Sequence, residues 1–221
     1  MRLALFDLDH TLLSGDSDVL WCEFLMDEGL LDRAEFAPRN AEMARRYAEA
    51  SVSAQDFSEF YVATLAGRTP AEWAPLCERF LAEVIAPRIP PAAHALVESH
   101  RTRGDRLVLT TATNRGLTGM TARHLGIADL IATEVELVNG RCSGRTAGVL
   151  NMREGKVERL RSWLDEQGLP VTLLGEGVFY SDSSNDLPLL QAVAEPVAVD
   201  PDAALARHAA AAGWSVLKLA R

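Results

Sequence analysis

Two aspartates stand two positions apart, directly after a short apolar run near the N-terminus. The run covers residues 3–6, and the acidic residues are Asp7 and Asp9. Four apolar residues before a polar break are typical of a strand buried on both faces, and alternate side chains of extended backbone point to the same side. Two neighbouring carboxylates repel each other unless a proton or a cation lies between them. Because Mg2+ favours oxygen ligands, the pair is a candidate magnesium site, although such pairs also occur in turns and helix caps.

Polar side chains also follow two later apolar runs. Thr111 ends the second run, and Asp182 and Asp186 follow the third. In a parallel sheet, functional residues gather beyond the carboxyl ends of the strands, so we expect these groups to meet. Lys156, near the start of a predicted helix, adds an ammonium group. Carboxylates for a metal, beside hydroxyls, helix-start N–H groups and an ammonium for an anion, indicate a phosphate-bearing ligand.

The rest of the chain predicts the elements that must position these residues. After the first strand the chain reads as successive helices, which we interpret as an inserted all-helical cap, and Pro38 should break or restart one of them. Beyond them, helices and strands alternate, which indicates a mostly parallel, Rossmann-like sheet covered by helices. The predicted fold class is therefore α/β, with residues 1–14 and 90–221 forming the core and residues 15–89 forming the cap.

Composition and charge exclude several classes of partner. The 221 residues include 22 Lys and Arg against 31 Asp and Glu, for a formal net charge of -9. Without a basic stripe, nucleic acid and anionic membranes are poor partners. The three cysteines lack a C-x-x-C spacing, so neither a zinc site nor a disulfide framework is indicated. With no recognisable signal peptide or membrane span we expect a cytoplasmic protein, whose oligomeric state the sequence does not indicate.

The order of these motifs resembles the haloacid dehalogenase-like superfamily, in particular its phosphoserine phosphatase-like branch with a helical cap after the first strand. The resemblance implies a Mg2+-dependent phosphomonoesterase that hydrolyses a small phosphorylated metabolite through an aspartyl-phosphate intermediate. Dehalogenases of this superfamily lack the second aspartate, so Asp9 favours phosphate chemistry. The four matching motifs are Asp7-Leu8-Asp9-His10-Thr11, Thr111, Lys156, and Asp182 with Asp186.

The resemblance also implies a role for each matching residue. Asp7 is the expected nucleophile, and Asp9 is the expected acid that protonates the leaving oxygen and then the base that activates water. Mg2+ is expected to bind Asp7, the backbone carbonyl of Asp9, and Asp182. Thr111 is expected to hydrogen-bond a transferring oxygen, and Lys156 to offset the negative charge of the phosphoryl group.

Substrate specificity is expected from the cap and from the turn that leads into it. Asp16 and Asp18 could receive an amino group or another cation of the substrate, or they could only cap the first cap helix. Asn114 is a further candidate substrate contact, together with the threonine of the second motif. The chain reads Ala112-Thr113 where phosphoserine phosphatases typically carry Gly-Gly. This departure puts phosphoserine in doubt and leaves histidinol phosphate as an alternative substrate.

Two other functions fit the same motifs. A phosphotransferase or mutase would pass the phosphoryl group from the aspartate to another hydroxyl instead of water. A non-catalytic phosphate-binding protein would keep the fold without turnover, but the complete set of matching residues argues against it.

Overall fold

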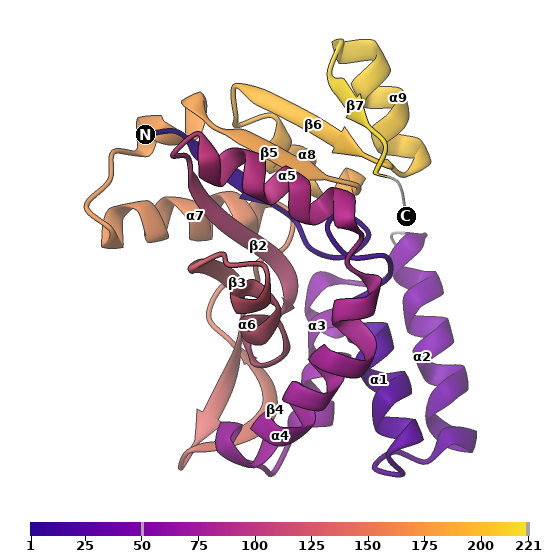
Figure 1. Ribbon diagram of the computed structural model, residues 1–221. Coiled ribbons are helices and arrows are strands. Elements are labelled where there is room, and N and C mark those ends of the chain that lie inside the picture. The colour runs from indigo at the N-terminus through magenta and orange to yellow at the C-terminus, as the bar shows by residue number, and fades with distance from the viewer. Residues whose placement is uncertain (50, 220–221) are drawn as a thin grey trace.

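In the computed structural model, which describes residues 1–49 and 51–219, the chain folds around a seven-stranded sheet (Figure 1). The strand order is β4-β3-β2-β1-β5-β6-β7. Only the β3–β4 pair among them is antiparallel. The strands are β1 Leu3–Phe6, β2 Arg106–Asn114, β3 Asp129–Val138, β4 Arg141–Ala147, β5 Val178–Ser181, β6 Glu195–Val199 and β7 Ser215–Leu217. The predicted mostly parallel sheet is therefore confirmed.

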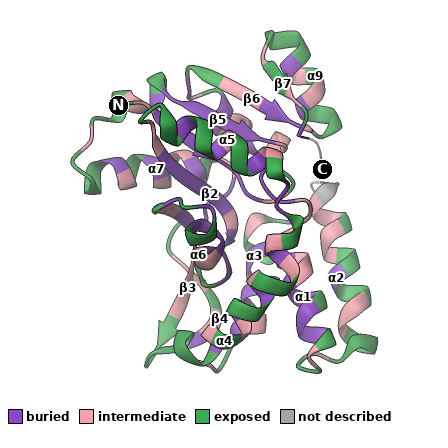
Figure 2. Ribbon diagram, viewed as in Figure 1, coloured by how far each residue is buried: buried purple, intermediate pink, exposed green. Residues whose placement is uncertain are grey.

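Helices cover both faces of this sheet. Along β1, Ala4 and Phe6 pack into the cluster that includes residues of α5 and α6, whereas Leu3 and Leu5 pack into the cluster that includes residues of α7, α8 and α9. Because successive side chains of a strand point to opposite faces, an all-apolar β1 is required, and all four of its residues are buried. The neighbouring strands β2 and β5 are also largely buried (Figure 2). The helices are α5 Pro91–Thr102, α6 Arg115–His124, α7 Glu154–Glu166, α8 Leu187–Leu190 and α9 Ala203–Ala212.

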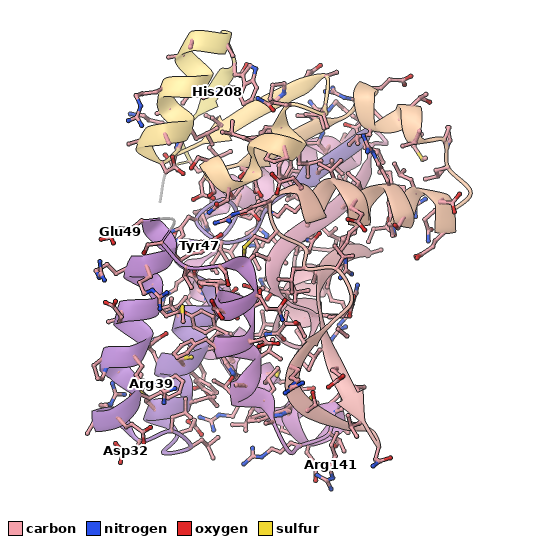
Figure 3. The ribbon with its side chains drawn as sticks, turned by 180° about the vertical axis from the view of Figure 1, so that it is seen from behind. Asp32, Arg39, Tyr47, Glu49, Arg141 and His208 are labelled. Carbon is pink, nitrogen blue, oxygen red and sulfur yellow. The ribbon has the colours of Figure 1, made fainter. Side chains whose placement is uncertain are left out.

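The elements between β1 and α5 are helical, as predicted for the cap. They include α1 Ser17–Asp27, α2 Arg33–Ala48, α3 Ala54–Val62 and α4 Pro70–Phe80. A 3-10 turn, Ala63–Leu65, separates α3 from α4, and a π-helical turn, Leu81–Ile85, and a 3-10 turn, Ala86–Arg88, follow α4. The end of α2 that carries Tyr47 lies next to the core, whereas Asp32 marks the far end (Figure 3). The proposed division into core and cap stays a prediction, and its residues 50, 220 and 221 lie outside the described part.

The predicted break at Pro38 is wrong, because α2 runs through it without interruption. A proline inside a helix removes one backbone hydrogen bond and crowds the preceding turn. Here tertiary contacts hold the helix against α1 and α3. The amide of Asn40 donates to the carbonyl of Val19 at 3.2 Å, and Phe36 stacks on Phe60. Packing of α2 against α1 and α3 therefore overrides the tendency of proline to interrupt a helix.

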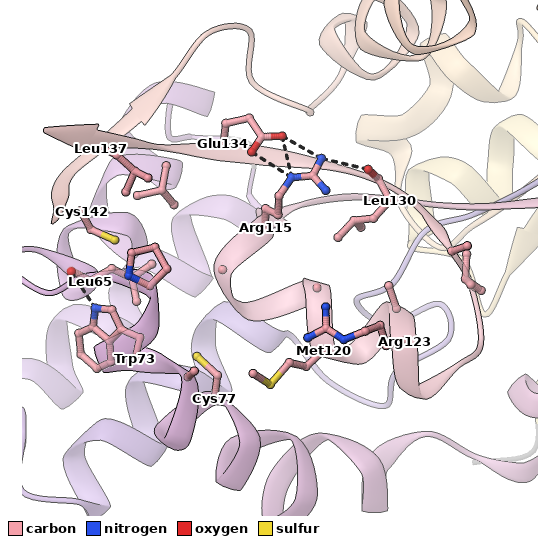
Figure 4. A pocket seen from close by; sticks show the side chains of 18 residues that line it. Leu65, Trp73, Cys77, Arg115, Met120, Arg123, Leu130, Glu134, Leu137 and Cys142 are labelled. Atoms are coloured by element: carbon pink, nitrogen blue, oxygen red, sulfur yellow. Dashed lines mark hydrogen bonds and ion pairs between the residues drawn. The ribbon is translucent and has the colours of Figure 1, made fainter. Parts of the chain in front are cut away.

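The β3–β4 hairpin reaches the cap and is hydrogen-bonded to it. The backbone N–H of Gly67 donates to the carbonyl of Cys142 at 2.9 Å, and the N–H of Cys142 donates to the carbonyl of Arg68 at 2.9 Å. Between the hairpin, α4 and α6 lies a largely apolar cavity of about 450 Å³, in which Arg115 is paired with Glu134 (Figure 4). Within the described ranges, no helix combines the length and apolar character that crossing a bilayer requires.

Candidate active site

The carboxyl ends of β1, β2 and β5 meet because β1 pairs with the other two strands in parallel. The N–H of Asp7 donates to the carbonyl of Tyr180 at 2.9 Å, which extends the β1–β5 pairing to the first site residue. A cavity of about 60 Å³ opens at this edge. The core contributes Asp7, Asp9, Lys156 and Asp182 to its lining, and the cap and its entry turn contribute Asp16, Tyr47 and Phe57.

Lys156 joins two carboxylates in the interior of the site. Its Nζ donates at 2.7 Å to Oδ1 of Asp7 and at 2.7 Å to Oδ2 of Asp186, and all three residues are buried. Burial opposes the charge of Lys156, but the two carboxylates raise the pKa of its ammonium group. Burial raises the pKa of Asp7 to about 7, although Lys156 pulls it down. Asp186 therefore orients Lys156, since it accepts from this ammonium and from the hydroxyl of Ser181 at 2.7 Å.

Thr11 links the ends of β1 and β5. Its hydroxyl lies 3.2 Å from Oδ2 of Asp7 and 3.0 Å from Oδ1 of Asp182, and it accepts from the N–H of Asp182 at 3.0 Å. Thr11 is fully buried. Burial and the neighbouring Asp7 carboxylate raise the pKa of Asp182 well above its ordinary value. One hydroxyl thus holds two carboxylates that repel each other within reach of the same cavity.

Asp9 is held through both of its oxygens. Oδ1 accepts from the backbone N–H of Ser17 at 2.7 Å. Oδ2 accepts from the hydroxyl of Thr113 at 3.0 Å, and the hydroxyl of Thr111 lies 3.4 Å from the same oxygen. The first turn of α1 and the end of β2 therefore fix the orientation of this carboxyl group.

The two acidic residues predicted at the cap entry occupy different positions. Asp16 lines the cavity and is the N-cap of α1, because its Oδ1 accepts from the N–H groups of Asp18 and Val19 at 2.9 and 3.1 Å. Burial, with a contribution from Asp9, raises the pKa of Asp16 to about 7. Asp18 lies behind Thr113, from which its Oδ2 is 3.0 Å away, and it is not among the residues that line the cavity.

Two residues predicted from the second motif lie outside the cavity lining. Thr111 is fully buried behind Asp9, and Asn114 is the N-cap of α6, where its Oδ1 accepts from the N–H of Leu117 at 3.3 Å. Ala112 and Thr113 line the cavity instead. The end of β2 is tied to the core by Asn151, whose amide donates to the carbonyl of Thr111 at 2.9 Å.

Sequence reasoning assigned no role to several residues that shape the site. Thr11 belongs to the first motif, and its position two residues after Asp9 is the signal that could have found it. Tyr47 comes from the end of α2 that lies next to the core, and it stacks on Phe57 with ring centroids 4.1 Å apart. Burial, followed by the site carboxylates, raises the pKa of the Tyr47 hydroxyl well above its ordinary value. No local pattern around Tyr47 indicates this position.

Comparison with known proteins identifies the class to which this fold and site belong. Residues 4–191 match the family model of the haloacid dehalogenase-like hydrolases. The chain therefore belongs to this family, and the predicted superfamily and hydrolase class are confirmed.

Individual proteins similar to this chain include two named phosphatases and two solved structures. The chain is 41% identical to a histidinol-phosphatase of Neisseria meningitidis serogroup C (strain 8013), over 98% of each chain. It is 33% identical to a phosphoserine phosphatase of Mycobacterium tuberculosis (strain ATCC 25618 / H37Rv), over 96% of this chain and 69% of that one. A solved structure from Bordetella pertussis Tohama I, of a protein of unknown function, superposes with a TM-score of 0.91 at 44% identity over 98% of this chain and 97% of that one. A substrate-bound phosphoserine phosphatase superposes with a TM-score of 0.69 at 15% identity over 98% and 92% of the two chains, which shows the shared fold.

Proposed function

We propose that this hydrolase is a Mg2+-dependent phosphomonoesterase that acts on a small, amine-bearing phosphorylated metabolite through an aspartyl-phosphate on Asp7. The observation that carries the proposal is the environment of Asp7. One of its oxygens accepts from the buried ammonium of Lys156 at 2.7 Å, and the other lies 3.2 Å from the hydroxyl of Thr11. A carboxylate held in this way beside a cation is oriented for attack on an anionic phosphate, whose charge Lys156 offsets.

In the proposed reaction, Asp7 is the nucleophile and Asp9 is the general acid and base. An oxygen of Asp7 attacks phosphorus, and the bond to the leaving oxygen breaks while Asp9 gives that oxygen its proton. Asp9 then takes a proton from water, the water oxygen attacks phosphorus, and inorganic phosphate leaves Asp7 free again. The fixed orientation of Asp9, whose Oδ1 accepts from the N–H of Ser17 at 2.7 Å, supports this assignment.

The donor atoms at this edge of the sheet fit Mg2+. Asp7 and Asp182 approach the hydroxyl of Thr11 to within 3.2 and 3.0 Å. Desolvation raises the pKa of both carboxyl groups, and the Asp7 carboxylate adds to the shift of Asp182. The described residues contain no cluster of three or more His, Cys, Asp or Glu side chains placed to hold a metal ion, so the ion would have only two side-chain ligands, Asp7 and Asp182. The backbone carbonyl of Asp9 and water molecules would complete the set, which suits an ion that retains several waters. When bound, Mg2+ would supply Lewis-acid stabilisation of charge on the phosphoryl oxygens.

Histidinol phosphate is the substrate that we propose first, ahead of phosphoserine. The relative named histidinol-phosphatase shares 41% of its residues with this chain over 98% of both chains. Asp16, whose carboxyl group lines the cavity, would receive the positive charge of an amine-bearing substrate. This contact and its role as helix N-cap use different oxygens, because only Oδ1 of Asp16 accepts from the backbone.

Turnover of three phosphate esters tests the proposal. Wild-type protein with Mg2+ is expected to release phosphate from p-nitrophenyl phosphate, histidinol phosphate and phosphoserine, with the largest kcat/KM for histidinol phosphate. Chelation of Mg2+ by EDTA and the substitution Asp7→Asn are each expected to abolish turnover. Equal turnover by wild-type protein and Asp7→Asn would refute the mechanism, and a larger kcat/KM for phosphoserine would refute the substrate assignment.

Product analysis separates hydrolysis from phosphotransfer at the same site. In the presence of an acceptor alcohol, a hydrolase yields free phosphate in proportion to the ester consumed. Transfer of most phosphoryl groups to the alcohol would instead show a phosphotransferase.

A further inference from the structure

Three oxygen atoms surround the hydroxyl of Thr113, a residue that is 2% exposed. Oδ2 of Asp9 and Oδ2 of Asp18 each lie 3.0 Å away. The hydroxyl of Ser17 lies 3.1 Å away and donates to Thr113. A hydroxyl donates one hydrogen bond and accepts two, so the three contacts use its full capacity. Glycine or alanine at this position could make none of them.

This capacity determines where the protons lie. Because Thr113 accepts from Ser17, it has one further bond to accept and one to donate. Two carboxyl groups face it, so one of them accepts the Thr113 proton and the other carries a proton of its own and donates it to Thr113. If both carboxyl groups were ionised, only one of them could accept the single proton of the Thr113 hydroxyl. No hydrogen atom would then lie between Oγ1 of Thr113 and the oxygen of the other carboxylate.

Asp18 is the carboxyl group that donates to Thr113, so the contact with Thr113 does not decide whether Asp9 carries a proton on another lone pair. It is 3% exposed, and no hydrogen bond reaches its Oδ1 from any described residue. A buried charge without a partner is costly, and such a group becomes neutral instead. Burial, followed by Asp16 and Asp9, raises the pKa of Asp18 well above its ordinary value. Asp9 is more exposed, and its Oδ1 accepts from the N–H of Ser17 at 2.7 Å.

We propose that Thr113 is a positioning residue that aims the carboxyl group of Asp9, and that neutral Asp18 fixes the direction of the Thr113 hydroxyl. The chain of donors runs from the carboxyl O–H of Asp18 to Thr113 and from Thr113 to Oδ2 of Asp9. With Ser17 on Oδ1, the carboxyl group of Asp9 is held from both sides. The inference rests on the proposed function, in which Asp9 protonates the leaving oxygen.

The leaving group decides how much the enzyme depends on this orientation. The alcohol part of an alkyl phosphate such as histidinol phosphate leaves as a strongly basic alkoxide unless Asp9 gives its oxygen a proton while the P–O bond breaks. p-Nitrophenolate is a stable anion and leaves without a proton. Because kcat/KM covers only the steps up to transfer of the phosphoryl group to Asp7, it reports on this proton transfer and not on later hydrolysis.

Substitutions at Thr113 test the inference with these two esters. Thr113→Val removes the hydroxyl at nearly constant volume and is expected to lower kcat/KM for histidinol phosphate about tenfold or more, and for p-nitrophenyl phosphate by less than about threefold. Thr113→Ser restores the hydroxyl and is expected to restore alkyl ester turnover. The matched control is Thr118→Val, which removes another buried threonine hydroxyl, one that donates to the carbonyl of Asn114 at 2.9 Å away from the cavity. It is expected to change neither ester.

Several results would overturn the inference while leaving the proposed function intact. These are equal losses on both esters, no loss on the alkyl ester, and failure of Thr113→Ser to restore it. If Thr113→Val does not fold, as judged by circular dichroism, Thr113→Ala takes its place with the same expected ratio. Wild-type protein that turns over neither ester would contradict the proposed function and the inference with it.

Discussion

Asp16→Asn separates the two roles that the sequence left open for Asp16. The substitution removes a charge and keeps an oxygen where Oδ1 now accepts from the N–H groups of Asp18 and Val19. Asparagine is as good an N-cap as aspartate. Any effect of the substitution beyond a few tenths of a kcal/mol therefore comes from the lost charge and not from a lost helix cap.

The magnitude follows from the pKa of the carboxyl group. Burial, and then Asp9, raise the pKa of Asp16 from 3.8 to about 7. The folded protein therefore holds a proton that the unfolded chain has released between these values, so the free energy of unfolding falls as the pH rises through this window. A shift of about three pKa units lowers the free energy of unfolding by about 4 kcal/mol once the pH is above this window. About 2 to 3 kcal/mol of this decrease falls between about pH 5 and about pH 8. Asp16 is partly exposed, so solvent makes these figures upper limits.

This pH dependence is measured by urea unfolding of wild-type protein and Asp16→Asn in EDTA, at about pH 5 and at about pH 8. We expect the variant to gain stability over the wild type on going from about pH 5 to about pH 8, by up to about 2 to 3 kcal/mol. Other carboxylates titrate in both proteins and largely cancel in the difference. A difference between the two proteins that does not change with pH would refute the reasoning, because Asp16 would then ionise without cost.

The same variant tests substrate binding. We expect the KM of Asp16→Asn for histidinol phosphate to rise about tenfold, as for one lost charge-assisted contact. The KM for p-nitrophenyl phosphate, which has no amine, should not change. Equal KM values of variant and wild type for both esters would leave Asp16 only as a helix cap.

Two further substitutions test how the site is held together. Lys156→Met leaves the buried carboxylates of Asp7 and Asp186 without their cation, so we expect a loss of about 3 to 5 kcal/mol in urea unfolding at neutral pH and at least about a hundredfold loss of aryl phosphate turnover. An unchanged free energy of unfolding would show that these carboxyl groups are already neutral. Thr11→Val removes the hydroxyl between Asp7 and Asp182, and calorimetric titration should show Mg2+ affinity about tenfold weaker. Unaltered affinity would show that the Thr11 hydroxyl does not hold Asp7 and Asp182 in place for the ion.

The backbone rules of a parallel sheet explain which parts of the site could be predicted. Asp7 and Asp182 are far apart in the sequence, yet each follows an apolar run, and β1 and β5 pair in parallel so that the two strands end together. The same rule brought Thr111 next to Asp9, with 3.4 Å between the hydroxyl and Oδ2. Lys156 was predicted from its place in the order of the motifs, and the structure brings its ammonium to Asp7. The ends of the strands and the order of the motifs can both be read from the sequence alone.

Side-chain networks could not be predicted because they depend on rotamers and on contacts between distant elements. Asn114 looked like a substrate contact because it lies at a strand end, but it is the N-cap of α6. Tyr47 reaches the cavity only because α2 continues through Pro38 and ends beside the core. A broken helix, as the sequence predicted, would have placed Tyr47 elsewhere.

The two cavities show why volume alone does not identify the site. The cavity between α4, α6 and the hairpin measures about 450 Å³, but the described residues that line it include no cluster of carboxylates, and two of the three charged ones, Arg115 and Glu134, pair with each other. The cavity at the strand ends measures only about 60 Å³. It is lined by carboxylates whose pKa values are raised because burial and their mutual repulsion oppose ionisation, and by the ammonium of Lys156. Such groups remain in a fold at a cost in stability, and a bound cation and a phosphoryl group are the partners that would offset it.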